Sequence, residues 1–129
     1  MKTKTIRQIV KFKASPLEVY ETLMDSKKHS AFSGAKATIS KKIGGKISAY
    51  DEYISGVNIM LVPGKQIVQS WRGSDWPEGH FSNASFAFKK IAGGTQLTFI
   101  QEGVPEDQYR SIKQGWLDYY WKPMKDVLK

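Results

Sequence analysis

The chain has 129 residues, of which 40% are hydrophobic and 25% charged, and carries a net charge of +8 with no cysteine. This composition is typical of one globular domain, 1–129, and excludes disulfides, thiolate metal sites and a cysteine nucleophile. No apolar run reaches the roughly 20 residues of a membrane span, so we expect a cytoplasmic location.

The first predicted elements are a strand and two short helices. Residues 5–13 alternate apolar and polar side chains as a strand with one buried face does, with Ile6, Val10 and Phe12 on that face and Ile9 as an exception. The segment Ser15–Glu18 then supplies a serine N-cap, a proline at the first helical position and a glutamate that completes a capping box. The helix ends near Asp25. Residues 27–32 add a further helical turn, which Gly34 stops.

Six strand-like segments follow, separated by short turns that contain glycine or proline. Such regular spacing predicts an antiparallel meander with one buried face and one exposed face. The segments are 37–41, 46–51, 53–62, 66–72, 81–90 and 95–102.

A long amphipathic helix is predicted from Pro105 to the C-terminus. Gly115 destabilises a helix interior, which indicates a close approach to the sheet, and Pro123 predicts a kink. The predicted apolar stripe consists of Ile112, Trp116, Tyr119, Tyr120, Pro123, Met124 and Val127.

Together these elements predict an α+β helix-grip fold. A flat sheet cannot cover one long helix, so the antiparallel sheet must curve around it, with the short helices after the first strand. This packing often leaves a cavity between helix and sheet. The residues expected to line it are Tyr53, Phe86, Phe99, Trp116 and Tyr120.

The segment Ser70–Ser82 gathers two tryptophans, an arginine, two carboxylates and a histidine between two strands. Arg72, Trp76 and His80 are predicted to contact a partner, and Trp76, beside Pro77, is the tryptophan expected to be exposed. The alternative is that the segment is a rigid and well-packed hairpin corner.

Enzymatic interpretations of this segment rest on fewer features. Arg72, Asp75, Glu78 and His80 provide acid and base groups for a cavity mouth, but the favoured interpretation is that the two carboxylates are solvated turn residues. A Ser82–His80–Asp75 triad lacks the G-x-S-x-G elbow. The two histidines have no metal-ligand spacing, so we expect no metal and no cofactor.

The positive charge is concentrated in the first third of the chain. Residues 1–46 contain 11 Lys and Arg residues against three acidic ones, whereas the remainder contains nine of each sign. The excess favours an acidic partner or an anionic membrane surface, but lysines that protect strand edges also explain it. We expect no nucleic-acid partner, because the aromatic residues are not interleaved with the lysines.

Several motifs, spread in order over nearly the whole chain, resemble the C-terminal domain of the activator of Hsp90 ATPase, within the START-like helix-grip superfamily. The resemblance implies a cytosolic domain that binds Hsp90 and helps it reach its ATPase-active conformation. Eukaryotic activators carry a separate N-terminal domain, for which we expect no room here. The motifs are Ser15–Tyr20, Gly44–Lys46, Val62–Lys65, Ile67–Arg72, Trp76–Phe81 and Gln114–Trp116 followed by Tyr119–Tyr120.

Three functions follow as hypotheses, in this order. The first is a non-enzymatic, co-chaperone-like module that binds an Hsp90-type chaperone. The second is a START-like binder of a small apolar or aromatic ligand under the C-terminal helix. The third, with the least support, is a cyclase- or hydrolase-like enzyme in the same cavity.

Overall fold

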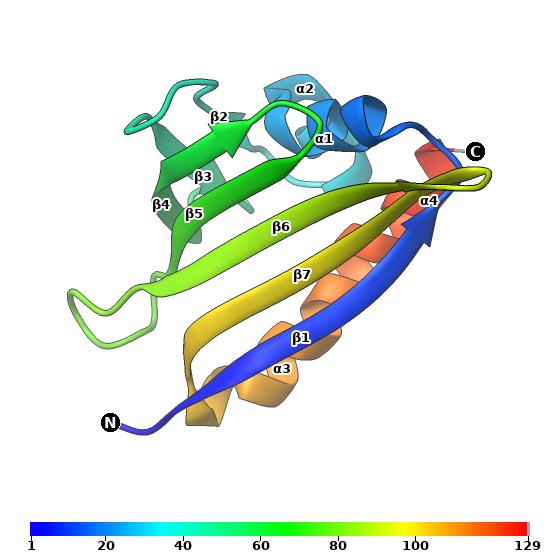
Figure 1. Ribbon diagram of the computed structural model, residues 1–129. Coiled ribbons are helices and arrows are strands. Elements are labelled where there is room, and N and C mark those ends of the chain that lie inside the picture. The colour runs from blue at the N-terminus through cyan, green and yellow to red at the C-terminus, as the bar shows by residue number, and fades with distance from the viewer. Residues whose placement is uncertain (129) are drawn as a thin grey trace.

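The computed structural model describes residues 1–128 and contains one antiparallel sheet of seven strands (Figure 1). The strands are β1 (Thr3–Phe12), β2 (Thr38–Ile39), β3 (Lys46–Ala49), β4 (Ile54–Val62), β5 (Gln66–Gly73), β6 (Ser82–Ile91) and β7 (Gly94–Pro105). Their order is β1-β7-β6-β5-β4-β3-β2, so the first two strands of the sequence form the two edges.

The helices all lie on one face of this sheet (Figure 1). They are α1 (Pro16–Met24), α2 (Ser26–Ser33), the 3-10 turn η1 (Glu106–Gln108), α3 (Tyr109–Gly115), the π-helical η2 (Trp116–Trp121) and α4 (Lys122–Val127). The last four run on from β7 as one long helical segment, which confirms the predicted α+β helix-grip architecture. None of these helices is long and apolar enough to cross a membrane.

The predicted capping signals act as expected. The Ser15 hydroxyl accepts the Glu18 backbone N–H at 3.2 Å and donates to the Glu18 carboxylate at 3.1 Å, with Pro16 as the first residue of α1. At the start of α2, an Asp25 carboxylate oxygen accepts the Lys28 N–H at 3.0 Å. Gly34 ends this helix in the left-handed conformation, with φ of 77°, as glycine does most readily.

The C-terminal helix buries part of the predicted stripe together with a residue that the prediction lacks. Trp116, Tyr120 and Met124 are buried as predicted and Trp121 is buried as well, whereas Tyr119 is 53% exposed. The cause is η2, where the Lys122 N–H bonds to the Leu117 carbonyl, five residues back. Such a π turn rotates the residues that follow, so Trp121 moves inward.

Val127, also placed in the predicted stripe, is 59% exposed for the same reason. Pro123 follows the π segment as the second residue of α4, and the helical segment continues past it to Val127. The predicted close approach of Gly115 to the sheet was also wrong, because a Cβ at this position would meet nothing closer than the Tyr119 ring, at 3.7 Å.

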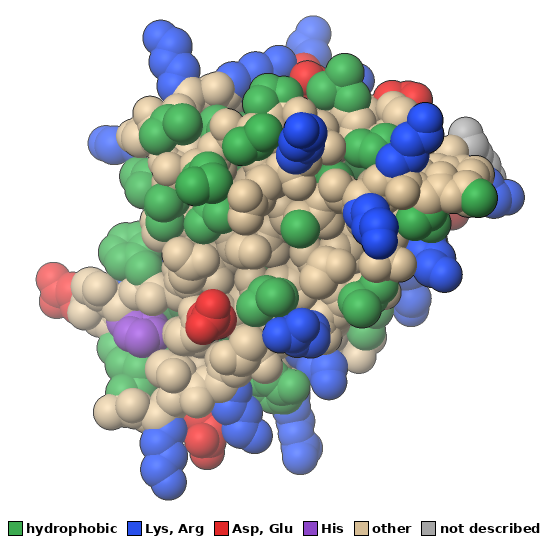
Figure 2. Space-filling view, in the orientation of Figure 1, with side chains coloured by type: hydrophobic (Ala, Val, Ile, Leu, Met, Phe, Trp, Pro, Cys, Tyr) green, Lys and Arg blue, Asp and Glu red, His purple; other side chains and the backbone are tan. Residues whose placement is uncertain are grey.

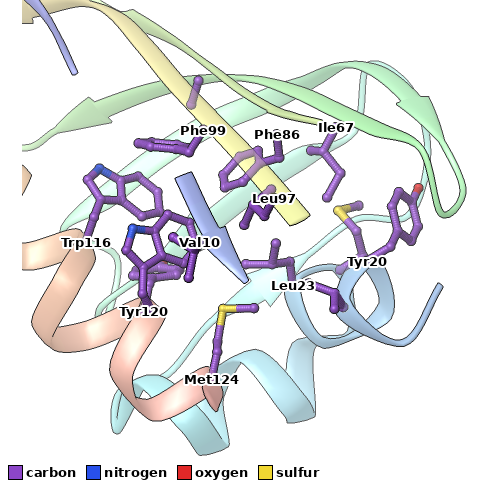
Figure 3. Close-up of a cluster of buried hydrophobic side chains, with 14 of the residues drawn as sticks. Val10, Tyr20, Leu23, Ile67, Phe86, Leu97, Phe99, Trp116, Tyr120 and Met124 are labelled. Atoms are coloured by element: carbon purple, nitrogen blue, oxygen red, sulfur yellow. The ribbon is translucent and has the colours of Figure 1, made fainter. Parts of the chain in front are cut away.

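The core between sheet and helices is rich in aromatic rings. Figure 3 shows Phe86 and Phe99 of the sheet facing Trp116 and Tyr120 of the helical segment. The Phe99 and Trp116 ring centroids lie 4.2 Å apart, and those of Trp116 and Tyr120 lie 4.5 Å apart. Because each ring buries a large apolar area, this layer fixes the helix on the inner face of the sheet.

Replacing two glycines tests these packing assignments. Gly115→Ala should raise the unfolding free energy by about 0.5–1 kcal/mol, because alanine favours a helix and the site has space. Gly56→Ala should lower it by ~2–3 kcal/mol, because its Cβ would lie 1.7 Å from the Ser70 carbonyl oxygen. Urea titration measures both, and a destabilised Gly115→Ala protein would contradict the packing described for the helix.

Candidate functional site

A cavity of about 320 Å³ lies between the C-terminal helical segment and the strands around β5. Seven of its lining residues are aromatic and none is charged. The lining consists of Tyr50, Tyr53, Ile54, Trp71, Trp76, Gln101, Ser111, Ile112, Gly115, Trp116, Tyr119 and Tyr120.

The five residues predicted for the cavity fall into two groups. Tyr53, Trp116 and Tyr120 belong to the lining. Phe86 and Phe99 lie in the core and pack against the Trp116 ring, at centroid distances of 5.8 and 4.2 Å. These two rings therefore support the cavity wall without forming it.

A chain of buried hydrogen bonds fastens this wall to the sheet. The Trp116 indole N–H donates to the Gln101 side-chain oxygen at 2.8 Å, and the Gln101 amide donates to the Ser82 hydroxyl at 2.9 Å. That hydroxyl donates in turn to the Trp71 carbonyl at 2.9 Å. Because buried polar groups are costly unless paired, this network fixes one position for the Trp116 ring.

A second buried contact joins the cavity to α2. His29 is 2% exposed, and its Nε2 lies 2.7 Å from the Tyr120 hydroxyl while its Nδ1 lies 3.0 Å from the Leu23 carbonyl. The Nδ1 therefore carries the hydrogen, and Tyr120 donates to Nε2. Burial lowers the pKa of His29 to about 4 and raises the pKa of Tyr120 well above its usual value, so both side chains are neutral.

The turn between β3 and β4 shapes the mouth of the cavity. Tyr50, Asp51 and Glu52 have φ values of 54°, 53° and 76°, in the left-handed region that non-glycine residues rarely adopt. Asp51 anchors the turn, since its N–H donates to the Lys36 carbonyl and its carboxylate accepts the Lys36 N–H, both at 3.0 Å. Consecutive strained residues held in this way occur mainly at functional sites.

The predicted exposure of Trp76 was wrong, because this side chain is 4% exposed and belongs to the cavity lining. Gly73 provides the space. A Cβ on Gly73 would lie 2.6 Å from the Trp76 indole nitrogen and 2.8 Å from the Tyr53 hydroxyl. The indole N–H has no aligned hydrogen-bond partner, although it lies near the Tyr53 hydroxyl and slightly lowers the pKa of that group.

The other groups of the Ser70–Ser82 segment hold this loop against the body of the protein. The Arg72 guanidinium donates to the Trp76 carbonyl at 2.8 Å, and the His80 Nε2 lies 2.7 Å from the Gly103 carbonyl. The Tyr53 hydroxyl donates to Asp75 at 2.6 Å. Burial, followed by this bond to Asp75, raises the pKa of Tyr53 to about 12.

The catalytic arrangements considered from the sequence do not assemble. Ser82 bonds to Trp71 and Gln101, while His80 bonds to Gly103, so the hydroxyl and the imidazole of the considered triad bond to other groups. Glu78 lies exposed in the loop. Within residues 1–128, no group of three or more acidic or histidine side chains is placed to hold a metal ion.

Comparison with known proteins identifies the family. The family model "Activator of Hsp90 ATPase homolog 1-like protein" matches residues 13–129. The human "Activator of 90 kDa heat shock protein ATPase homolog 1" is 37% identical over 116 residues, which make up 90% of this chain and 34% of the relative. The chain belongs to this family. It spans about a third of the length of the curated relatives that it matches.

Solved structures agree with the fold. An HSP90 activator from Plasmodium falciparum has a TM-score of 0.88 at 21% identity, over 96% of this chain and 95% of that one. The Aha1 dimer from Colwellia psychrerythraea has a TM-score of 0.82 at 20% identity, over 97% of this chain and 96% of that one. These likenesses support the helix-grip fold, while the family model and the human relative confirm the family resemblance of the sequence motifs.

The buried His29–Tyr120 contact predicts a stability that depends on pH. The unfolded chain binds a proton at His29 near pH 6.5, whereas the folded chain excludes it down to about pH 4. Stability should therefore fall as the pH falls through this window, and His29 should account for up to about 3 kcal/mol of the loss. Urea unfolding at pH 7 and pH 4.5 should show a shallower dependence for His29→Gln. Equal pH dependences for the two proteins would exclude this role.

Proposed function

We propose that the chain is a non-enzymatic binding domain that engages an Hsp90-type chaperone in the cytoplasm and promotes its ATPase cycle. The observation that carries this proposal is family membership over residues 13–129, together with curated relatives named as activators of the 90 kDa heat shock protein ATPase. The unassembled catalytic groups are consistent with a binding role rather than a chemical one.

The residues that we expected to contact a partner need revision under this proposal. Trp76 is buried in the cavity wall and cannot anchor another protein without leaving it. Arg72 and His80 are half-buried and hold the loop closed. We therefore assign these three residues to the shape of the domain and look elsewhere for its docking surface.

Binding should be strong at low salt and weak at high salt, because the chain carries a net charge of +8. Isothermal titration of the 129-residue chain into Hsp90 from the same organism should show weaker binding at 500 mM than at 50 mM NaCl. The chaperone's ATPase rate should rise on addition of the chain. An unrelated basic protein of similar size serves as the control. No binding and no rate change at 50 mM NaCl would refute the proposal.

A second candidate function is the binding of a small ligand in the aromatic cavity. Its volume of about 320 Å³ lies at the lower end of the range for small-molecule pockets. The lining has no charged side chain, and the indole N–H groups of Trp71 and Trp116 already donate to Gln69 and Gln101. The ligand that fits this lining is neutral, flat and apolar or aromatic.

A fragment titration tests this second function, with 2-naphthol as the probe. The indole N–H resonances of Trp71 and Trp116 should shift on addition of the probe and saturate. Gly115→Leu should abolish the shifts because it adds a side chain to the lining, whereas Gln114→Leu, at the neighbouring exposed position, should preserve them. Shifts that are absent, or equal in both variants, would rule out the cavity as the site.

A further inference from the structure

No helix within residues 1–128 covers the face of the sheet opposite α1–α4, and Figure 2 looks directly onto this open face. Cross-strand pairing places Ile9, Thr98 and Ala87 in one outward row, and Ile100, Ser85 and Val68 in the next. We call these two rows the neutral floor. The seven strands, at about 4.8 Å spacing, give a face roughly 29 Å wide.

Positive charge borders the neutral floor. Lys11 and Lys89 flank Gln96 in the adjacent row, and Arg7 pairs with Ile100 at the β1 end of the floor. The seven strands, all within residues 1–128, contain seven Lys and Arg residues but a single acidic residue, Glu102. In Figure 2, Lys and Arg side chains lie over and around this face.

The sequence order of the charges does not reveal this surface. The basic first third of the chain supplies both edges, because β1 and β2 lie at opposite sides of the sheet. Its lysines are divided between these two edges and α2, which carries Lys27 and Lys28, so they do not form one patch. The rim of the neutral floor instead combines β1 residues with Lys89, which comes from the part of the chain with no net charge.

We propose that this open face docks against an acidic surface of the Hsp90-type partner, an inference that rests on the proposed function. The basic rim is complementary in charge to an acidic protein surface, which it would attract and orient during binding. The floor provides apolar contact area next to this charge, since Ile9 is 60% exposed between Arg7 and Lys11 on β1, and Thr98 and Ala87 in its row are small.

A protein fits this face better than a nucleic acid does. None of the six floor residues is aromatic, so the face has no platform on which bases could stack. The basic groups lie on two sides of the floor, at Arg7 and in the Lys11–Gln96–Lys89 row, and the acidic Glu102 lies beyond the Ile100 row, whereas a phosphate backbone requires a continuous basic track. A partner that covers the floor must therefore bury apolar side chains at its centre and place acidic side chains at its edge.

Two matched double variants test the proposal in the full chain. Lys11→Glu with Lys89→Glu reverses charge on the rim, and Lys27→Glu with Lys125→Glu makes the same net change on exposed helical positions of the other face. Titration into Hsp90 from the same organism at 50 mM NaCl should show at least tenfold weaker binding for the rim variant. The helical variant should bind within about threefold of wild type.

The Ala87→Arg variant distinguishes direct contact of the partner with the floor from long-range attraction by net charge. It adds positive charge but fills the floor, so binding should weaken if the partner covers this face and strengthen if only net charge matters. Circular dichroism and urea titration should show all variants folded, since every substituted residue is exposed.

The outcomes are distinct. If wild type does not bind the chaperone, the proposed function and this inference both fail. If wild type binds but the two double variants weaken binding equally, or Ala87→Arg strengthens it, the assignment to the open face alone is wrong. Tighter binding of wild type to phosphatidylserine-containing vesicles or to a DNA duplex than to the chaperone would overturn the protein partner.

Discussion

The contact between Trp116 and the sheet is the interaction on which the rest of this structure depends. Its ring lies 4.2 Å from Phe99 and 4.8 Å from Trp71, centroid to centroid, and its N–H donates to buried Gln101. Aromatic pairs of this kind contribute about 0.5–1.5 kcal/mol each beyond their burial. The hydrogen bond also fixes the orientation of the ring, because a displaced ring would leave the Trp116 N–H and the Gln101 side-chain oxygen without their partners.

Fixing the helix in this position divides the molecule into two different faces. The inner face is filled by aromatic rings, and the imperfect fit of large rings leaves the cavity between the helix and the strained β3–β4 turn. Because every helix within residues 1–128 lies on that side, none of them covers the outer face. The proposed ligand site lies on the inner face and the proposed docking surface on the outer one, so the two proposals are compatible.

Sequence patterns predicted the features that depend on local chemistry. The Ser15 cap, the Gly34 stop and the alternation of the strands each follow from neighbouring residues, and so does the antiparallel meander.

Features that are set by contacts between residues distant in the sequence were missed. Trp76 next to proline in a loop suggests exposure, and only its approach to Gly73 explains its burial. Nothing in the sequence around His29 indicates its contact with Tyr120, 91 residues away. The π turn likewise changed which helix residues face the core.

Methyl NMR of the labelled chain bound to Hsp90 tests most directly whether the open face carries the partner. The methyl resonances of Ile9, Ile100 and Met60, which lie on the open face of the sheet, should broaden or shift on complex formation. Those of Leu117 and Val127, which are exposed on the helical side, should stay unchanged. The reverse pattern, in which the methyl groups of Leu117 and Val127 are perturbed and those of the open face are not, would contradict docking through the open face of the sheet.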